Sequence, residues 1–143
     1  MTNTKQAATV LAFGALSAIY GMDADLENNG AWMVAGDNGQ GKTMRIKLRS
    51  QQSDRARIVA KEIADEYRAI YATAQLTPAQ EDTQAVDMMA RALVVDWENF
   101  PNTEGGQLLC TVESVKAVMA ALPQLRRVCE AFTTKVSNYQ KKA

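Results

Sequence analysis

The chain of 143 residues contains no histidine and only two cysteines. The absence of histidine excludes Ser-His-Asp and Cys-His catalysis, and it excludes every zinc site that uses an imidazole ligand. Two cysteines, Cys110 and Cys129, cannot complete a four-thiolate zinc site, and their spacing does not match a CxxC redox motif. We therefore interpret both as free, buried, small apolar residues of a protein from a reducing compartment.

An excess of charge of either sign is also absent. Sixteen lysines and arginines balance sixteen aspartates and glutamates, so the formal net charge is zero. Domains that bind nucleic acid usually carry a basic face or tail. The one local group of cations, Arg45, Lys47 and Arg49, fits the solvent-facing side of a strand. We expect no nucleic-acid partner.

No apolar run is long enough to cross a bilayer, which requires ~20 residues. The nearest is AATVLAFGALSAIY at residues 7–20, which is short, rich in small residues and not followed by a clean signal-peptide cleavage site. We expect no membrane association and interpret this run as a helix that packs on the domain or on a partner. Its large apolar residues Leu11, Phe13 and Leu16 are candidate partner-binding residues.

The residues that are present suit one globular domain. Apolar residues make up 47% of the chain, and a chain of this length can bury a real core. We expect residues 1–30 to form an N-terminal apolar, helical segment followed by a turn. Residues 31–143 are expected to form a single helical domain that begins with a β-hairpin at about 31–49. The predicted fold class is mainly α, with about four to five helices and one small β-hairpin (α+β).

The hairpin is predicted from two short strand-like runs. Residues 31–34 are apolar, and residues 43–49 alternate strictly, with Met44, Ile46 and Leu48 on one face. Period-two alternation is typical of a half-buried strand. Between these runs lies GDNGQG at residues 36–41, a concentration of turn-forming residues that favours a hairpin loop.

Four helices are predicted after the hairpin. Their expected limits are Ser53 or Asp54 to about Tyr71, Thr77-Pro78 to about Trp97, Thr111 to Pro123, and Gln124 to about Tyr139. In the last helix, Leu125, Val128, Cys129 and Phe132 are expected to face the core. Trp97 is expected to be mostly buried, because core packing is the usual role of an aromatic residue on an apolar helix face. Trp97 and Phe100 are also candidate contacts to a partner protein.

Residues 36–43, GDNGQGKT, match the P-loop pattern G-x-x-x-x-G-K-[ST]. Residues 93–96, LVVD, could supply the metal-binding acid of such an enzyme. A P-loop must be followed at once by a helix whose N-terminus binds phosphate, whereas Thr43 enters a strand-like run. Asp96 also falls within a long helical pattern. We interpret the match as a hairpin loop and keep a nucleotide hydrolase as a remote alternative. We predict no catalytic residue, no cofactor and no metal.

Several short elements resemble one known family. They are YG at residues 20–21, DLExxGxW at 25–32, KLR at 47–49, VDWENF at 95–100, GG at 105–106, LCTVE at 109–113, LP at 122–123 and NY at 138–139. Together these elements resemble the tail assembly chaperones of tailed bacteriophages. The resemblance implies a protein without cofactor or catalytic residues that acts in the host cytoplasm.

Members of that family hold the apolar tape-measure protein soluble while tail-tube subunits polymerise around it. The expected partners are therefore the tape-measure and tail-tube proteins, and self-association is a further possibility. The alternative from a different class is a structural component of the virion, such as a head–tail connector or a decoration subunit. Either role would use exposed apolar surface, so the sequence does not separate them.

Overall fold

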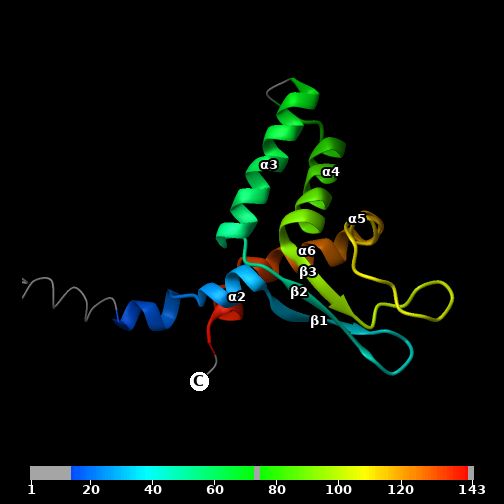
Figure 1. Ribbon diagram of the computed structural model, residues 1–143, viewed down its shortest axis with the longest axis horizontal. Helices are drawn as coiled ribbons and strands as arrows, with labels where there is room; N and C mark the ends of the chain where they lie inside the picture. Colours follow the sequence, from blue (N-terminus) through cyan, green and yellow to red (C-terminus); the bar gives the residue numbers. More distant parts are fainter. Residues whose placement is uncertain (1–13, 73–74, 142–143) are drawn as a thin grey trace, which may run out of the picture.

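The computed structural model describes residues 14–72 and 75–141, which form helices packed on one small sheet (Figure 1). The predicted helical character and α+β class are confirmed. Within the described residues the sheet has three strands, so the prediction of a lone hairpin was wrong. Leu11 and Phe13 lie outside the described residues.

The sheet is antiparallel, with strand order β1-β2-β3. Its strands are β1 (Ala31–Asp37), β2 (Thr43–Leu48) and β3 (Val94–Glu98). The predicted alternation in β2 is confirmed, because Ile46 and Leu48 are fully buried. Both outer strands contain a register shift where they pair with β2, between Val34 and Gly36 in β1 and opposite Lys47–Leu48 in β3.

Strand β3 corrects the prediction of a helix that continues to Trp97. Helix α4 (Pro78–Met88) ends earlier and is followed by a π-helical segment, Met89–Leu93. The chain then extends, and Trp97 pairs with Ile46 in the sheet. Val94 and Val95 suit a strand because β-branched side chains pack well on a pleated surface. A buried strand and a buried helix face both present apolar residues, which is why periodicity alone misassigned this short segment.

The helix starts agree with the sequence predictions. Helix α3 (Asp54–Tyr71) is capped by Ser53, whose side chain accepts a hydrogen bond from the Ala56 N–H. Helices α4 and α5 (Val112–Ala121) each begin with a capping box, formed by Thr77 with Gln80 and by Thr111 with Ser114. Reciprocal side-chain bonds of this kind satisfy N–H groups that have no partner within the helix.

The C-terminal part contains helix α6 (Pro123–Thr133) and a 3₁₀ turn, Val136–Tyr139. Its buried residues are Arg126, Cys129 and Thr133, whereas Val128 is exposed. The expected apolar face is therefore wrong at Val128. Arg126 replaces it near the core because its guanidinium is paired with Glu130 at 2.6 Å and lies 3.6 Å from the Asp82 carboxylate. A buried charge is tolerated when it is paired in this way.

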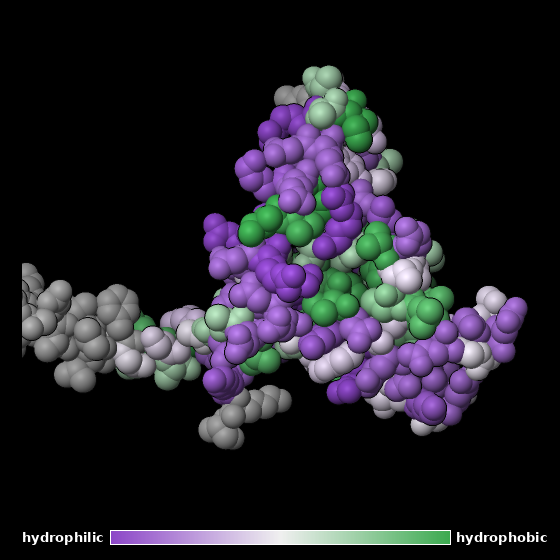
Figure 2. All heavy atoms as spheres, viewed as in Figure 1, coloured by the Kyte–Doolittle hydropathy of each residue, from purple (hydrophilic) through white to green (hydrophobic). Residues whose placement is uncertain are grey.

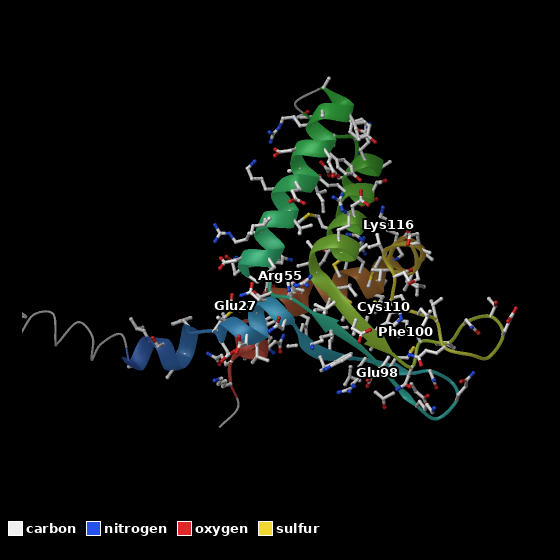
Figure 3. The ribbon with its side chains drawn as sticks, viewed as in Figure 1. Glu27, Arg55, Glu98, Phe100, Cys110 and Lys116 are labelled. Atoms are coloured by element: carbon white, nitrogen blue, oxygen red, sulfur yellow. The ribbon has the colours of Figure 1, made fainter. Side chains whose placement is uncertain are left out.

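The core lies between the sheet and the helices. Met33, Ile46 and Leu48 from the sheet pack with Ala56 of α3 and with the π-helical segment, and Met119 of α5 and Cys129 of α6 complete this cluster. Helices α3 and α4 form a projecting pair above the sheet in Figure 1. Tyr67 of α3 donates a hydrogen bond to Asp87 of α4, and the Lys116 ammonium of α5 lies 3.0 Å from the same carboxylate. Figure 3 places Lys116 on α5, facing the helix pair.

Candidate interaction surface

The N-terminal end of the described chain is a helix at residues 14–20 in which every residue is exposed. It stands apart from the packed helices and sheet (Figure 1). Leu16, Ile19 and Tyr20 are 49%, 62% and 67% exposed. Residues at i, i+3 and i+4 lie on one helix face, so these three side chains form one apolar strip. We call residues 14–20 the N-terminal helix.

A polar joint fixes the C-terminal end of the N-terminal helix to the rest of the protein. The Gln140 side-chain amide donates to the carbonyls of Ile19 and Gly21, each at 3.0 Å, and approaches that of Ala18 at 3.4 Å. The N–H of Gly21 donates to the Ser17 carbonyl at 2.8 Å. A Cβ at position 21 would lie 2.5 Å from that carbonyl oxygen, so the close approach requires glycine.

Helix α2 (Ala24–Asn29) follows the joint in the chain and connects it to the folded body through hydrogen bonds. Asp23 caps α2 by accepting from the Leu26 N–H, and its own N–H donates to the Tyr139 carbonyl at 2.7 Å. The hydrogen bond from Leu26, helped by Lys141, outweighs partial desolvation and lowers the pKa of Asp23. Tyr139 is fully buried and donates to the Leu48 carbonyl of β2 at 3.1 Å. Burial, with a smaller contribution from the negative charge of Glu27, raises the pKa of Tyr139, so this hydroxyl stays protonated.

The turn at Gly30 sets the direction in which β1 leaves this joint. Gly30 ends α2 with φ +100°, a conformation that favours glycine. A Cβ there would lie 3.0 Å from Lys47 Cγ and 3.2 Å from the Leu48 carbonyl oxygen. The N-terminal helix thus joins the sheet through short, hydrogen-bonded segments, while its apolar side chains remain outside the core.

The other two sequence candidates, Trp97 and Phe100, belong to the core. Their side chains are 3% and 6% exposed, and their rings stack with centroids 4.4 Å apart. The Trp97 indole N–H donates to the Leu108 carbonyl at 2.8 Å. Figure 3 places Phe100 beside Cys110 near the end of β3. The predicted burial of Trp97 is confirmed, and in the folded chain neither ring offers a free surface to a partner.

The two cysteines, Cys110 and Cys129, are free. Cys129 is fully buried as predicted, whereas Cys110 is only half-buried, so that part of the prediction was wrong. Burial raises the pKa of the Cys110 thiol to about 11 and that of Cys129 to about 12. Thiols with such values carry almost no thiolate at neutral pH, and the thiolate is the nucleophilic form.

The predicted hairpin loop is present but shorter than expected, because β1 continues to Asp37 and β2 begins at Thr43, which leaves residues 38–42 as the loop. Three backbone N–H groups of residues 36–43 donate hydrogen bonds to side chains of the same segment. Asp37 accepts from the Gly39 N–H at 2.9 Å, and Asn38 accepts from Gln40 and Lys42 at 2.7 and 3.2 Å. A P-loop instead points these N–H groups at phosphate oxygens. Asp96 does lie on a strand, contrary to expectation, but that strand is antiparallel to β2.

The remaining exposed apolar residues lie on several elements of the body. They include Val34, Ile58, Ile70, Leu109, Leu122 and Val128. On the face in Figure 2, apolar atoms gather at the tip of the α3–α4 pair and around α4 and α5, with polar atoms between them. No residues from 14–72 and 75–141 form a group of three or more potential metal ligands. None of the helices in this part of the chain is long and apolar enough to cross a membrane.

Searches of protein-family models, curated proteins and solved structures found no match to this chain.

Proposed function

We propose that the protein is a non-enzymatic assembly chaperone of a phage tail, which binds apolar segments of the tape-measure protein during assembly in the host cytoplasm. The observation that carries this proposal is the apolar strip of Leu16, Ile19 and Tyr20, which is exposed on the N-terminal helix. The C-terminal end of that helix is hydrogen-bonded to the body through Gln140. Contiguous exposed apolar surface of this kind is typical of a binding site for another protein. The sequence resemblance to tail assembly chaperones supplies the identity of the partner.

The location of this strip suits a chaperone for an elongated apolar client. A strip on a separate helix can contact successive client segments while the core of the body stays closed. The formal net charge is zero, and no charged residue lies within residues 14–20. Binding is therefore driven by apolar burial, and we expect it to depend little on salt concentration.

The proposal is tested by co-expressing the intact protein with the tape-measure protein of the same phage. We expect the tape-measure protein to move from the insoluble to the soluble fraction and to co-purify with the chaperone. A tape-measure protein that stays insoluble would contradict the chaperone assignment.

Mass spectrometry of purified phage particles distinguishes the chaperone from a structural virion component. An assembly chaperone is expected to be absent from finished particles. Its presence in stoichiometric amounts would favour a head–tail connector or a decoration subunit instead.

A further inference from the structure

One side chain joins the N-terminal helix to the folded body. Within residues 14–72 and 75–141, every hydrogen bond between this helix and a part of the chain beyond Gly21 is donated by the Gln140 side-chain amide. All residues of the helix are exposed, so apolar packing contributes little to its position. The direction of the helix therefore depends on this amide and on the short link to α2.

The link itself leaves the helix little freedom. It begins at Gly21 and ends at Asp23, whose N–H donates to the Tyr139 carbonyl at 2.7 Å. The far end of the link is therefore fixed to the body. Gln140 bridges the near end, because its amide bonds Ile19 within the helix and Gly21 at the start of the link. With both ends held, the backbone torsions between them cannot turn freely.

The residues on either side of Gln140 are both anchored. Tyr139 is fully buried, and its hydroxyl donates to the Leu48 carbonyl at 3.1 Å. The Lys141 ammonium lies 3.4 Å from the Asp23 carboxylate. Gln140 is thus held between a core residue and an ion pair, and its amide reaches the helix from a fixed backbone.

The end of the N-terminal helix requires a hydrogen-bond donor at this place. The last carbonyls of a helix have no partner within it and carry partial negative charge. A primary amide has two N–H donors. The Gln140 nitrogen lies 3.0 Å from the carbonyl oxygens of both Ile19 and Gly21. An apolar side chain of the same length would leave these carbonyls to water, and the helix would turn about the link.

We propose that Gln140 is a positioning residue for client binding, which holds the N-terminal helix in one direction from the body. This inference rests on the proposed function. Gln140 acts through the helix, since it fixes the direction in which the strip of Leu16, Ile19 and Tyr20 is presented. A strip that is already oriented binds more tightly than a hinged one, because less freedom is lost when the client binds.

The first measurement is ¹⁵N relaxation of the backbone amides of residues 15–20 in the full chain without a client. Gln140→Met keeps the length of the side chain but removes its N–H donors. We expect the order parameter of these amides to fall from ~0.85, as in a rigid backbone, to below ~0.6. Gln140→Lys places a donor with positive charge at the end of the helix and should restore the rigid value.

The matched control is Gln107→Met, the same substitution at an exposed glutamine. It lies in the loop between β3 and α5, which Figure 1 places at the opposite end of the molecule from the N-terminal helix. The control should keep the wild-type order parameters. Circular dichroism checks that all three variants are folded.

The second measurement is the amount of soluble tape-measure protein obtained by co-expression. Gln140→Met should solubilise at least about threefold less than the wild type, because the client must now order the strip. Gln140→Lys and the control should solubilise wild-type amounts. Rescue by Gln140→Lys separates positioning from a general effect of changing residue 140.

Three results would overturn the inference: unchanged order parameters in Gln140→Met, a helix in Gln140→Lys that is as mobile as in Gln140→Met, or a mobile helix that still solubilises wild-type amounts. The last result leaves the proposed function standing, because the wild type still solubilises its client. If the wild type itself fails to solubilise the tape-measure protein, the proposed function fails and this inference falls with it.

Discussion

Tyr20 and Trp97 are both large aromatic residues in apolar stretches, yet the fold uses them in opposite ways. Trp97 is buried between the sheet and the helices, stacks on Phe100 and donates a hydrogen bond to the Leu108 carbonyl. Tyr20 lies on the N-terminal helix, where it is mostly exposed. The core of the body is complete without the side chains of the N-terminal helix. Their apolar surface is consequently available to a partner.

The largest expected effect comes from truncating each aromatic residue to alanine. Trp97→Ala should lower the free energy of unfolding by ~3–5 kcal/mol, because it removes a fully packed ring. Tyr20→Ala should change it by less than about 0.5 kcal/mol, as surface substitutions usually do. Urea unfolding followed by far-UV circular dichroism measures both values. Equal losses of stability would show that the N-terminal helix belongs to the folding unit.

The sequence predicted most element starts because they depend on local chemistry. Ser53, Thr77 and Thr111 cap helices through hydrogen bonds within one turn, and the alternation in residues 43–48 follows directly from the pleat. These features require no knowledge of distant residues. The hairpin loop between β1 and β2 was likewise predictable, because it is rich in turn-forming residues and Thr43, directly after Lys42, begins the alternating pattern.

The failures depend on contacts between distant parts of the chain. Residues 94–98 become a strand because β2 provides a partner, and the guanidinium of Arg126, near the core, lies 3.6 Å from the Asp82 carboxylate of α4. Sequence alone identified Leu16 as a candidate partner-binding residue. It identified Trp97 and Phe100 in the same way, although both are buried in the core. A joint centred on Gln140 was missed, because the sequence separation between Gln140 and Ile19 is 121 residues. Composition carries no signal for such a contact.

The body and the N-terminal helix are also expected to differ in how acid affects their stability. In the body, burial would raise the pKa of Asp87, but hydrogen bonds from Tyr67 and Lys116 outweigh this effect and lower the pKa below that of an ordinary aspartate. A lowered carboxylate pKa stabilises the folded state above about pH 4, and this contribution is lost as the pH falls through the folded-state value. We expect Asp87→Asn to be less stable at neutral pH and to lose less stability between about pH 5 and 3.

Unfolding measured at a series of pH values checks this expectation, with the exposed Asp25→Asn as the control. The control should keep the wild-type slope. An Asp87→Asn variant with the same acid sensitivity as the wild type would show that the α3–α4–α5 contact contributes no pH dependence.

The smallest effect on stability is expected at the joint itself. Gln140→Ala removes the side-chain donor to the Ile19 and Gly21 carbonyls, which lie at the exposed end of the N-terminal helix. The free energy of unfolding should change by less than about 0.5 kcal/mol. Limited proteolysis near Gly21 should nevertheless become faster, because the end of the helix loses its fixed position. Unchanged cleavage would mean that Gln140 does not hold the helix.

The most direct test of the central claim compares two triple variants during co-expression with the tape-measure protein. The first variant replaces the three exposed apolar residues of the N-terminal helix, Leu16, Ile19 and Tyr20, by serine. The control replaces Ile58, Ile70 and Val128 by serine; these residues are similarly exposed but lie on the body. Both variants should fold, as judged by circular dichroism. We expect the first variant to lose most of the solubilised tape-measure protein and the control to retain it. Full solubilisation by the first variant would contradict the assignment of the N-terminal helix as the binding surface.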